Sequence, residues 1–175
     1  MPTEGGLSSE FMRQAVYGAI GIAALLVASR LHMDTIRRLA PIIYAVSMAG
    51  LVVVLVLGDE QFGARRWIAL GPITVQPSEF ARIATVIAIA AYAAEREPGI
   101  RYMLTTLALA LGPMALILLE PDLGTTLVVG ATWLVLAATW GTSWRVLGGL
   151  SALAVSVLPI AFAVAVPAYQ RERLA

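Results

Sequence analysis

Long stretches without charge are the feature of this sequence that most limits its fold. Residues 39–58 contain no charged side chain, and similar apolar runs recur along the chain. A helix needs about 20 mostly apolar residues to cross the roughly 30 Å hydrocarbon core of a bilayer. Six candidate spans meet or approach this requirement: 14–29, 39–58, 77–94, 102–119, 123–143 and 146–166. Because open strands in lipid leave backbone groups unpaired, the sequence predicts an all-α, polytopic membrane bundle forming one unit over residues 1–175.

The composition agrees with this class and excludes several kinds of site. Apolar residues make up 59% of the chain and charged residues 13%, against roughly 25% charged residues in an average globular domain. The net charge of +1 gives no indication of nucleic-acid binding. The chain has no cysteine and a single histidine, His32. These counts exclude disulfides and thiol nucleophiles, and they argue against a histidine metal site or a Ser-His-Asp triad.

Arginines and tryptophans near the ends of the spans bear on orientation. With six spans, the connecting loops and termini carry six arginines on one side and five on the other. The tightest cluster outside a candidate motif lies in residues 30–38, so we predict that this side faces the cytoplasm. Three tryptophans bracket a helix end and are predicted to be interfacial anchors: Trp133, Trp140 and Trp144.

Glu79 and Arg82 are charged residues inside the third span. Their i, i+3 spacing places them on one helix face, about one turn after a helix start indicated by Pro77 and Ser78. An ionised residue in a bilayer costs at least a few kcal/mol, so it should face a partner or a cavity. A salt bridge that only neutralises both charges and a polar cavity open to one membrane face are both compatible with this pattern.

The Glu-Pro-Asp step at residues 120–122 is the second anomaly. It interrupts an apolar stretch from 102 to 143, and therefore predicts a surface turn. Asp122 is predicted to cap the helix that follows. The number of spans places this turn on the same side as the loop 58–77. One face of the bundle then gathers most of the unexplained polar residues: Arg65, Arg66, Glu79, Arg82, Glu120, Asp122 and the segment 169–173.

Such a face suits a substrate with an anionic headgroup and a long apolar tail. Guanidinium groups bind phosphate oxygens with two parallel hydrogen bonds, and carboxylates can take a proton from a hydroxyl nucleophile. A proton or ion transporter would use the same charges. Arg65, Arg66 and Trp67 alone also fit an ordinary interfacial turn. The residue types by themselves leave these alternatives open.

Three motifs carry a resemblance to a known family. They are GARRWIALGPITVQPSEFAR at 63–82, PDLGT at 121–125 and YQRER at 169–173. With these motifs in this order, the chain resembles the SEDS family (shape, elongation, division and sporulation), which includes RodA and FtsW. The motif that begins at Tyr169 and Gln170 is slightly closer to the RodA branch.

This resemblance implies a peptidoglycan glycosyltransferase that polymerises lipid II outside the bacterial cytoplasmic membrane. It implies a multi-pass protein among membrane lipids, with the signature loops facing outward, and a class B penicillin-binding protein as partner. No cofactor is identified, while a divalent cation remains open because pyrophosphate leaving groups often use one. The residues implied in the substrate cavity are Arg65, Arg66, Trp67, Gln76, Pro77, Ser78, Glu79, Arg82, Asp122, Gly124, Thr125, Tyr169, Gln170 and Arg173.

The chain departs from the family pattern in two ways. The family usually has lysine where this chain has Arg82. The arginine keeps the positive charge but changes the shape of the cavity. Family members have ten membrane helices and a later His-Thr-Asp-Phe type motif with the catalytic aspartate, and this chain has six predicted helices and no such motif. Asp122 belongs to a different motif and is not assigned that role.

We therefore expect the N-terminal half of a larger enzyme, without polymerase activity of its own. The alternatives are a transporter or flippase of a lipid-linked substrate, and a non-catalytic partner of a penicillin-binding protein.

Overall fold

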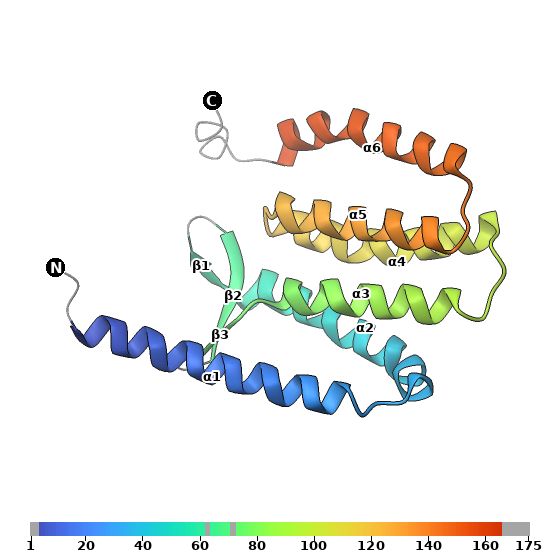
Figure 1. The fold of residues 1–175 in the computed structure, drawn as a ribbon. Helices are drawn as coiled ribbons and strands as arrows, with labels where there is room; N and C mark the ends of the chain where they lie inside the picture. Colours follow the sequence, from blue (N-terminus) through green and yellow to red (C-terminus); the bar gives the residue numbers. More distant parts are fainter. Residues whose placement is uncertain (1–3, 62–63, 71–72, 166–175) are drawn as a thin grey trace.

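A computed structural model describes residues 4–61, 64–70 and 73–165, which form six helices and three short strands (Figure 1). The helices are α1 (Glu4–Ala28), α2 (Met33–Leu57), α3 (Pro77–Ala93), α4 (Ile100–Leu119), α5 (Leu123–Thr139) and α6 (Trp144–Ala165). The six predicted helices are confirmed. The second begins six residues earlier than predicted, so the arginines of the 30–38 cluster lie mainly in its first turns.

The segment predicted as a loop at 58–77 contains a small antiparallel sheet. Its strands are β1 (Asp59–Gln61), β2 (Ala64–Leu70) and β3 (Ile73–Val75), in the order β1-β2-β3. β2 pairs with β3 through Ile68 opposite Val75, and the register with β1 shifts between Asp59 and Glu60. The prediction of a loop was therefore wrong for this segment, while the prediction of a helical bundle holds for the rest of the described chain. β-branched and aromatic residues on β2 and β3 favour the pleated conformation.

The bundle core lies among α2, α3, α4 and α5. One buried cluster takes a side chain from each of these helices: Leu51, Ala81, Ile117 and Val129. A second buried cluster joins α3, α4, α5 and α6, and includes Ile89, Met103 and Leu147. In lipid, such clusters stabilise the bundle through close van der Waals packing between the helices. The helices α2, α3, α4 and α5 therefore form a common scaffold for the segments at their ends.

Close packing of α2 against α4 depends on a glycine. A Cβ added at Gly112 would lie 2.9 Å from the Tyr44 hydroxyl oxygen. That hydroxyl donates to the Leu109 carbonyl at 2.8 Å. Small residues let helix backbones approach closely in membrane bundles, and the polar contact adds a direct link between the two helices.

The position of Trp133 contradicts its predicted role as an interfacial anchor. Its ring is buried in the second core cluster, and its Nε1–H group donates to the Thr106 hydroxyl at 3.3 Å. Trp133 is therefore a core residue of the bundle and not an interfacial anchor, since it lies one and a half turns inside α5 rather than at its end. Trp140 lies at the end of α5, where its Nε1–H group donates to the carbonyls of Ala93 and Arg96.

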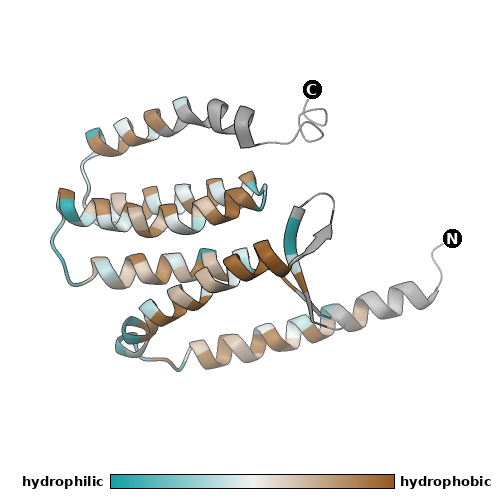
Figure 2. Cartoon of the chain, turned by 180° about the vertical axis from the view of Figure 1, so that it is seen from behind, coloured by the Kyte–Doolittle hydropathy of each residue, from teal (hydrophilic) through white to brown (hydrophobic). Residues whose placement is uncertain are grey.

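The outer surface of the bundle is apolar. Figure 2 shows mostly hydrophobic residues along the helices, with hydrophilic residues mainly in the loops, near helix ends and on β2. Among the residues described, α2 and α4 are long and apolar enough to span a membrane, and Gln14–Ala28 and Leu123–Thr139 are shorter apolar helices. α1 runs along the outside of the bundle (Figure 1), and its Tyr17 hydroxyl accepts a hydrogen bond from Thr74 N of β3 at 3.3 Å.

Candidate functional site

The polar segments singled out in the sequence gather at one end of the bundle. The sheet, the first turn of α3 and the turn 120–122 lie at this end, and the loops 29–32, 94–99 and 140–143 lie at the other (Figure 1). We call the first the sheet end. Two motifs that are separated in the sequence are thus brought together, as the number of spans predicted.

Arg66 joins the sheet to the turn 120–122. Its Nε–H group donates to the Glu120 carbonyl at 2.9 Å, and an Nη2–H group donates to the Pro121 carbonyl. Nη1 lies 3.8 Å from Asp122 Oδ2. We call this set of contacts the Arg66 clasp. Because the guanidinium donates mainly to backbone carbonyls, it fixes the position of β2 relative to the start of α5.

Asp122 caps α5, as predicted. Its Oδ1 accepts from Thr125 N at 3.0 Å, and its Oδ2 accepts from the Thr125 hydroxyl at 2.9 Å. An aspartate at this position satisfies a free N–H group of the first helical turn and contributes about 1 kcal/mol. Gly124 lies in the same turn and is exposed. The carboxylate that sequence reasoning placed near the substrate is therefore engaged in ordering the turn.

Glu120 is buried, although the sequence predicted a surface turn at this position. Its side chain is fully buried, and neither carboxyl oxygen has a hydrogen-bond partner. Burial raises the pKa of Glu120 from 4.5 to about 7, with a further increase from Asp122 and an opposing effect of Arg66. Glu120 was predicted on the polar face of the bundle, but it was not among the residues that the family resemblance implied in the substrate cavity. Its position between an apolar run and a proline gave no indication that the side chain turns inward.

Glu79 and Arg82 form the predicted ion pair on α3, through Arg82 Nη2 and Glu79 Oε2. The two side chains are 46% and 35% exposed, respectively. The pair therefore faces outward from the packed core, and a molecule beside the bundle can reach it. Water or lipid headgroups would screen such a pair, so its contribution to stability is about 0–1 kcal/mol.

The remaining predicted residues lie at the start of α3, on β2, or outside the described part of the chain. Pro77 is the first residue of α3 and is buried, as is Ser78, whose hydroxyl has no partner. Gln76 precedes the helix and is half-buried, without a side-chain capping bond. On β2, Trp67 is half-buried and Arg65 is exposed. Three predicted site residues lie outside the described part of the chain: Tyr169, Gln170 and Arg173.

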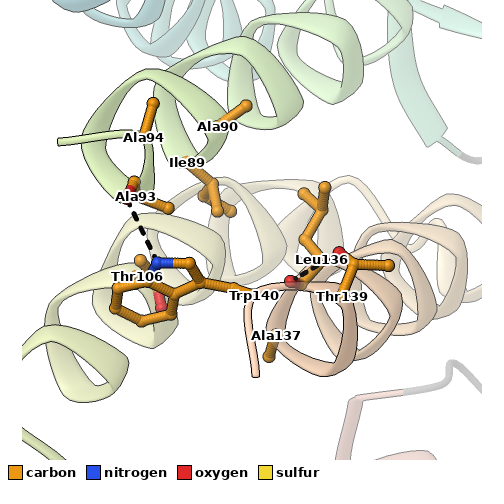
Figure 3. A pocket seen from close by; sticks show the side chains of 9 residues that line it. All are labelled: Ile89, Ala90, Ala93, Ala94, Thr106, Leu136, Ala137, Thr139 and Trp140. Carbon is orange, nitrogen blue, oxygen red and sulfur yellow. Dashed lines mark hydrogen bonds between the residues drawn. The ribbon is translucent and has the colours of Figure 1, made fainter. Parts of the chain in front are cut away.

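A cavity of about 210 Å³ lies at the opposite end, between α3, α4 and α5 (Figure 3). Trp140 forms one wall, and its Nε1–H group donates to the Ala93 carbonyl at 3.1 Å. The lining is mostly alanine and other apolar side chains. This cavity shares no residue with the predicted site, so it is separate from the sheet end.

The residues described at the sheet end form no cluster of metal ligands. In the described ranges, no three His, Asp or Glu side chains gather as ligands. Glu79 is paired with Arg82, and both oxygens of Asp122 are bonded to Thr125. A hard cation such as Mg²⁺ needs several free oxygen ligands. The sheet end instead presents the partly exposed guanidinium of Arg82 and a loop that Arg66 holds in place.

Comparison with known proteins identifies relatives over almost the whole chain. A sequence model of the FtsW, RodA and SpoVE proteins, described as cell cycle protein, matches residues 3–175. The chain is 32% identical over 169 residues to the probable peptidoglycan glycosyltransferase FtsW of Burkholderia thailandensis, covering 93% of this chain and 36% of that protein. It is 31% identical over 159 residues to the peptidoglycan glycosyltransferase MrdB of Escherichia coli K12, covering 89% and 43%.

Solved structures agree. A chain of a peptidoglycan synthase complex matches with a TM-score of 0.78 and 35% identity, over 93% of this chain and 49% of that chain. The rod shape determining protein RodA of Thermus thermophilus matches with a TM-score of 0.72 and 35% identity, over 82% and 49%. The chain thus spans less than half the length of the curated relatives reported above.

Proposed function

Because the chain belongs to the FtsW/RodA/SpoVE family of cell cycle proteins, we propose that it contributes the substrate-binding half of a peptidoglycan glycosyltransferase. As a member of this family it is an integral membrane protein of the bacterial cytoplasmic membrane. In the proposed reaction, a sugar hydroxyl of one lipid-linked disaccharide attacks the anomeric carbon of another. A glycosidic bond forms, undecaprenyl pyrophosphate leaves, and the hydroxyl proton passes to a base.

One observation carries this proposal. The Arg66 clasp joins the two signature motifs at the sheet end, and the accessible Glu79–Arg82 pair lies in the first turns of α3, which begins at the same end. A guanidinium binds phosphate oxygens bidentately, and its charge stabilises a pyrophosphate leaving group. We assign Arg82 to bind the pyrophosphate and Glu79 to orient Arg82. Arg66 holds the signature loop in place.

The base is expected outside this chain. Asp122 is occupied by the α5 cap, and Glu120 is too buried to reach a substrate hydroxyl. The relatives are more than twice as long as the matched part, which leaves room for that group. One relative of known structure belongs to a complex that coordinates polymerization and crosslinking. This supports a class B penicillin-binding protein as partner. We propose that the sheet end faces outward, where lipid II is polymerised.

Binding of lipid II tests the proposal directly. The chain in lipid nanodiscs would be cross-linked to lipid II carrying a photoreactive group on its sugar-peptide headgroup. A hydrogen bond to a charged group is worth about 1.5–3 kcal/mol, so Arg82→Ala should weaken binding roughly tenfold to a hundredfold. Arg82→Lys keeps the charge and should lose less. Arg145→Ala, an exposed arginine at the other end, is the matched control.

The outcomes separate the candidate functions. Equal binding by Arg82→Ala and Arg145→Ala would remove Arg82 from the site and leave the proposal without support. Glycan strands formed by the chain alone would contradict the placement of the base outside it. Movement of lipid II across proteoliposomes, without glycan product and lost in Glu79→Gln, would favour a flippase.

A further inference from the structure

Glu120 is a buried acid that the proposed reaction does not use. Its carboxyl oxygens are both buried without a hydrogen-bond partner, although its own backbone carbonyl is bonded to Arg66. An ionised carboxylate in apolar surroundings without partners costs several kcal/mol, and such a group takes up a proton instead. The geometry of the turn therefore favours the neutral acid.

The charged neighbours act on this acid in opposite directions. The charged side chains described at the sheet end come from β2, α3 and the turn: Arg65, Arg66, Glu79, Arg82 and Asp122. Glu79 and Arg82 pair with each other. From α2, the apolar side chain of Leu51 lies in the buried cluster that also contains Ile117, three residues before Glu120. Asp122 favours the protonated acid and Arg66 favours the carboxylate, so the pKa of Glu120 lies at about 7.

We propose that Glu120 is a proton-binding site and a positioning residue for Arg66. With the proton bound, Arg66 stays clasped to the carbonyls of the turn, as in the structure. When the proton leaves to water, the buried carboxylate requires a cation, and the guanidinium turns from the carbonyls to the carboxyl oxygens. The carboxyl O–H bond is the only covalent bond that breaks. The position of β2 then depends on pH near neutrality. The inference goes beyond the proposed function, because it concerns a proton and holds whatever the substrate.

Infrared spectroscopy of the chain in nanodiscs tests the proton site. The C=O stretch of a protonated carboxyl group, followed across roughly pH 5 to 9, should show a titration near pH 7 that is lost in Glu120→Gln. Arg66→Gln should shift the midpoint upward, and Asp122→Asn should shift it downward while keeping an α5 cap. Glu95→Gln, an exposed acid at the other end, should leave it unchanged. A titration that persists in Glu120→Gln overturns the proposal, as does the absence of any carboxyl titrating near neutrality.

Distance measurements test the positioning role. Because the chain has no cysteine, a spin-label pair can be introduced at exposed Thr74 on β3 and exposed Leu127 on α5 through two cysteine substitutions. The distance distribution should change with the same midpoint as the infrared signal, and it should stay fixed in Glu120→Gln. A pH-independent distance, or a change that survives Glu120→Gln, would show that Glu120 does not position Arg66. Circular dichroism establishes that each variant is folded.

Discussion

Replacing Arg66 with alanine should release the sheet from the turn 120–122. The substitution removes donors to the Glu120 and Pro121 carbonyls and the weaker contact with Asp122. Hydrogen bonds from a charged donor contribute about 1.5–3 kcal/mol each, and a partly exposed ion pair adds about 0–1 kcal/mol. The Arg66 side chain is 25% exposed, so water replaces part of what is lost. We expect a loss of about 2–4 kcal/mol in the free energy of unfolding.

Unfolding in mixed detergent micelles, followed by circular dichroism and tryptophan fluorescence, measures this loss. Arg66→Lys should fall between the wild type and Arg66→Ala, because an ammonium keeps the charge but lacks the planar fork that spans two carbonyls. Arg145→Ala at the opposite end should change stability by no more than about 0.5 kcal/mol. If Arg66→Ala matches Arg145→Ala, the clasp does not hold the sheet and the assignment of Arg66 as a brace is wrong.

Three further predictions concern stability. Asp122→Ala should cost about 1 kcal/mol and Asp122→Asn only a few tenths, measured by the same unfolding assay, because asparagine also caps helices. The pKa of Glu120 is raised on folding, so its stabilising contribution is complete below about pH 4.5 and is lost as pH rises to about 7. Relative to Glu120→Gln, the wild type should lose up to about 3 kcal/mol over that window and nothing above it. Gly112→Leu would force the Tyr44 hydroxyl away from α4, and a drop in melting temperature equivalent to about 1–3 kcal/mol should follow.

The helices could be predicted because lipid imposes a simple requirement on sequence. Each span must be apolar over a length set by the bilayer, so charges and glycine-proline clusters mark the ends. The Asp122 cap and the Glu79–Arg82 pair follow from local spacing, and both are present. Trp133 was assigned wrongly, since composition cannot tell a tryptophan that faces lipid from one that packs against Thr106 in a neighbouring helix.

Long-range contacts could not be predicted in the same way. The sheet was missed because glycines and prolines around β2 are equally typical of an irregular turn. Glu120 was assigned to the surface because nothing in Glu-Pro-Asp shows which side chain turns inward. Arg66 was considered as a cation for substrate, whereas its guanidinium is engaged with carbonyls 54 and 55 positions later in the chain. Such pairings depend on how α3, α4 and α5 pack together.

The separation of the two halves of the Arg66 clasp has a consequence for biosynthesis. β2 leaves the ribosome 54 residues before Glu120, which at about 5–20 residues per second corresponds to roughly 3–11 seconds. During that interval the strand has no turn to bind, and α4 and the start of α5 must be inserted before the clasp can close. The sheet is thus anchored late, by a segment made after it. A ribosome stalled before residue 120 should hold a nascent chain whose β2 segment is open to protease, and release of the stall should protect it.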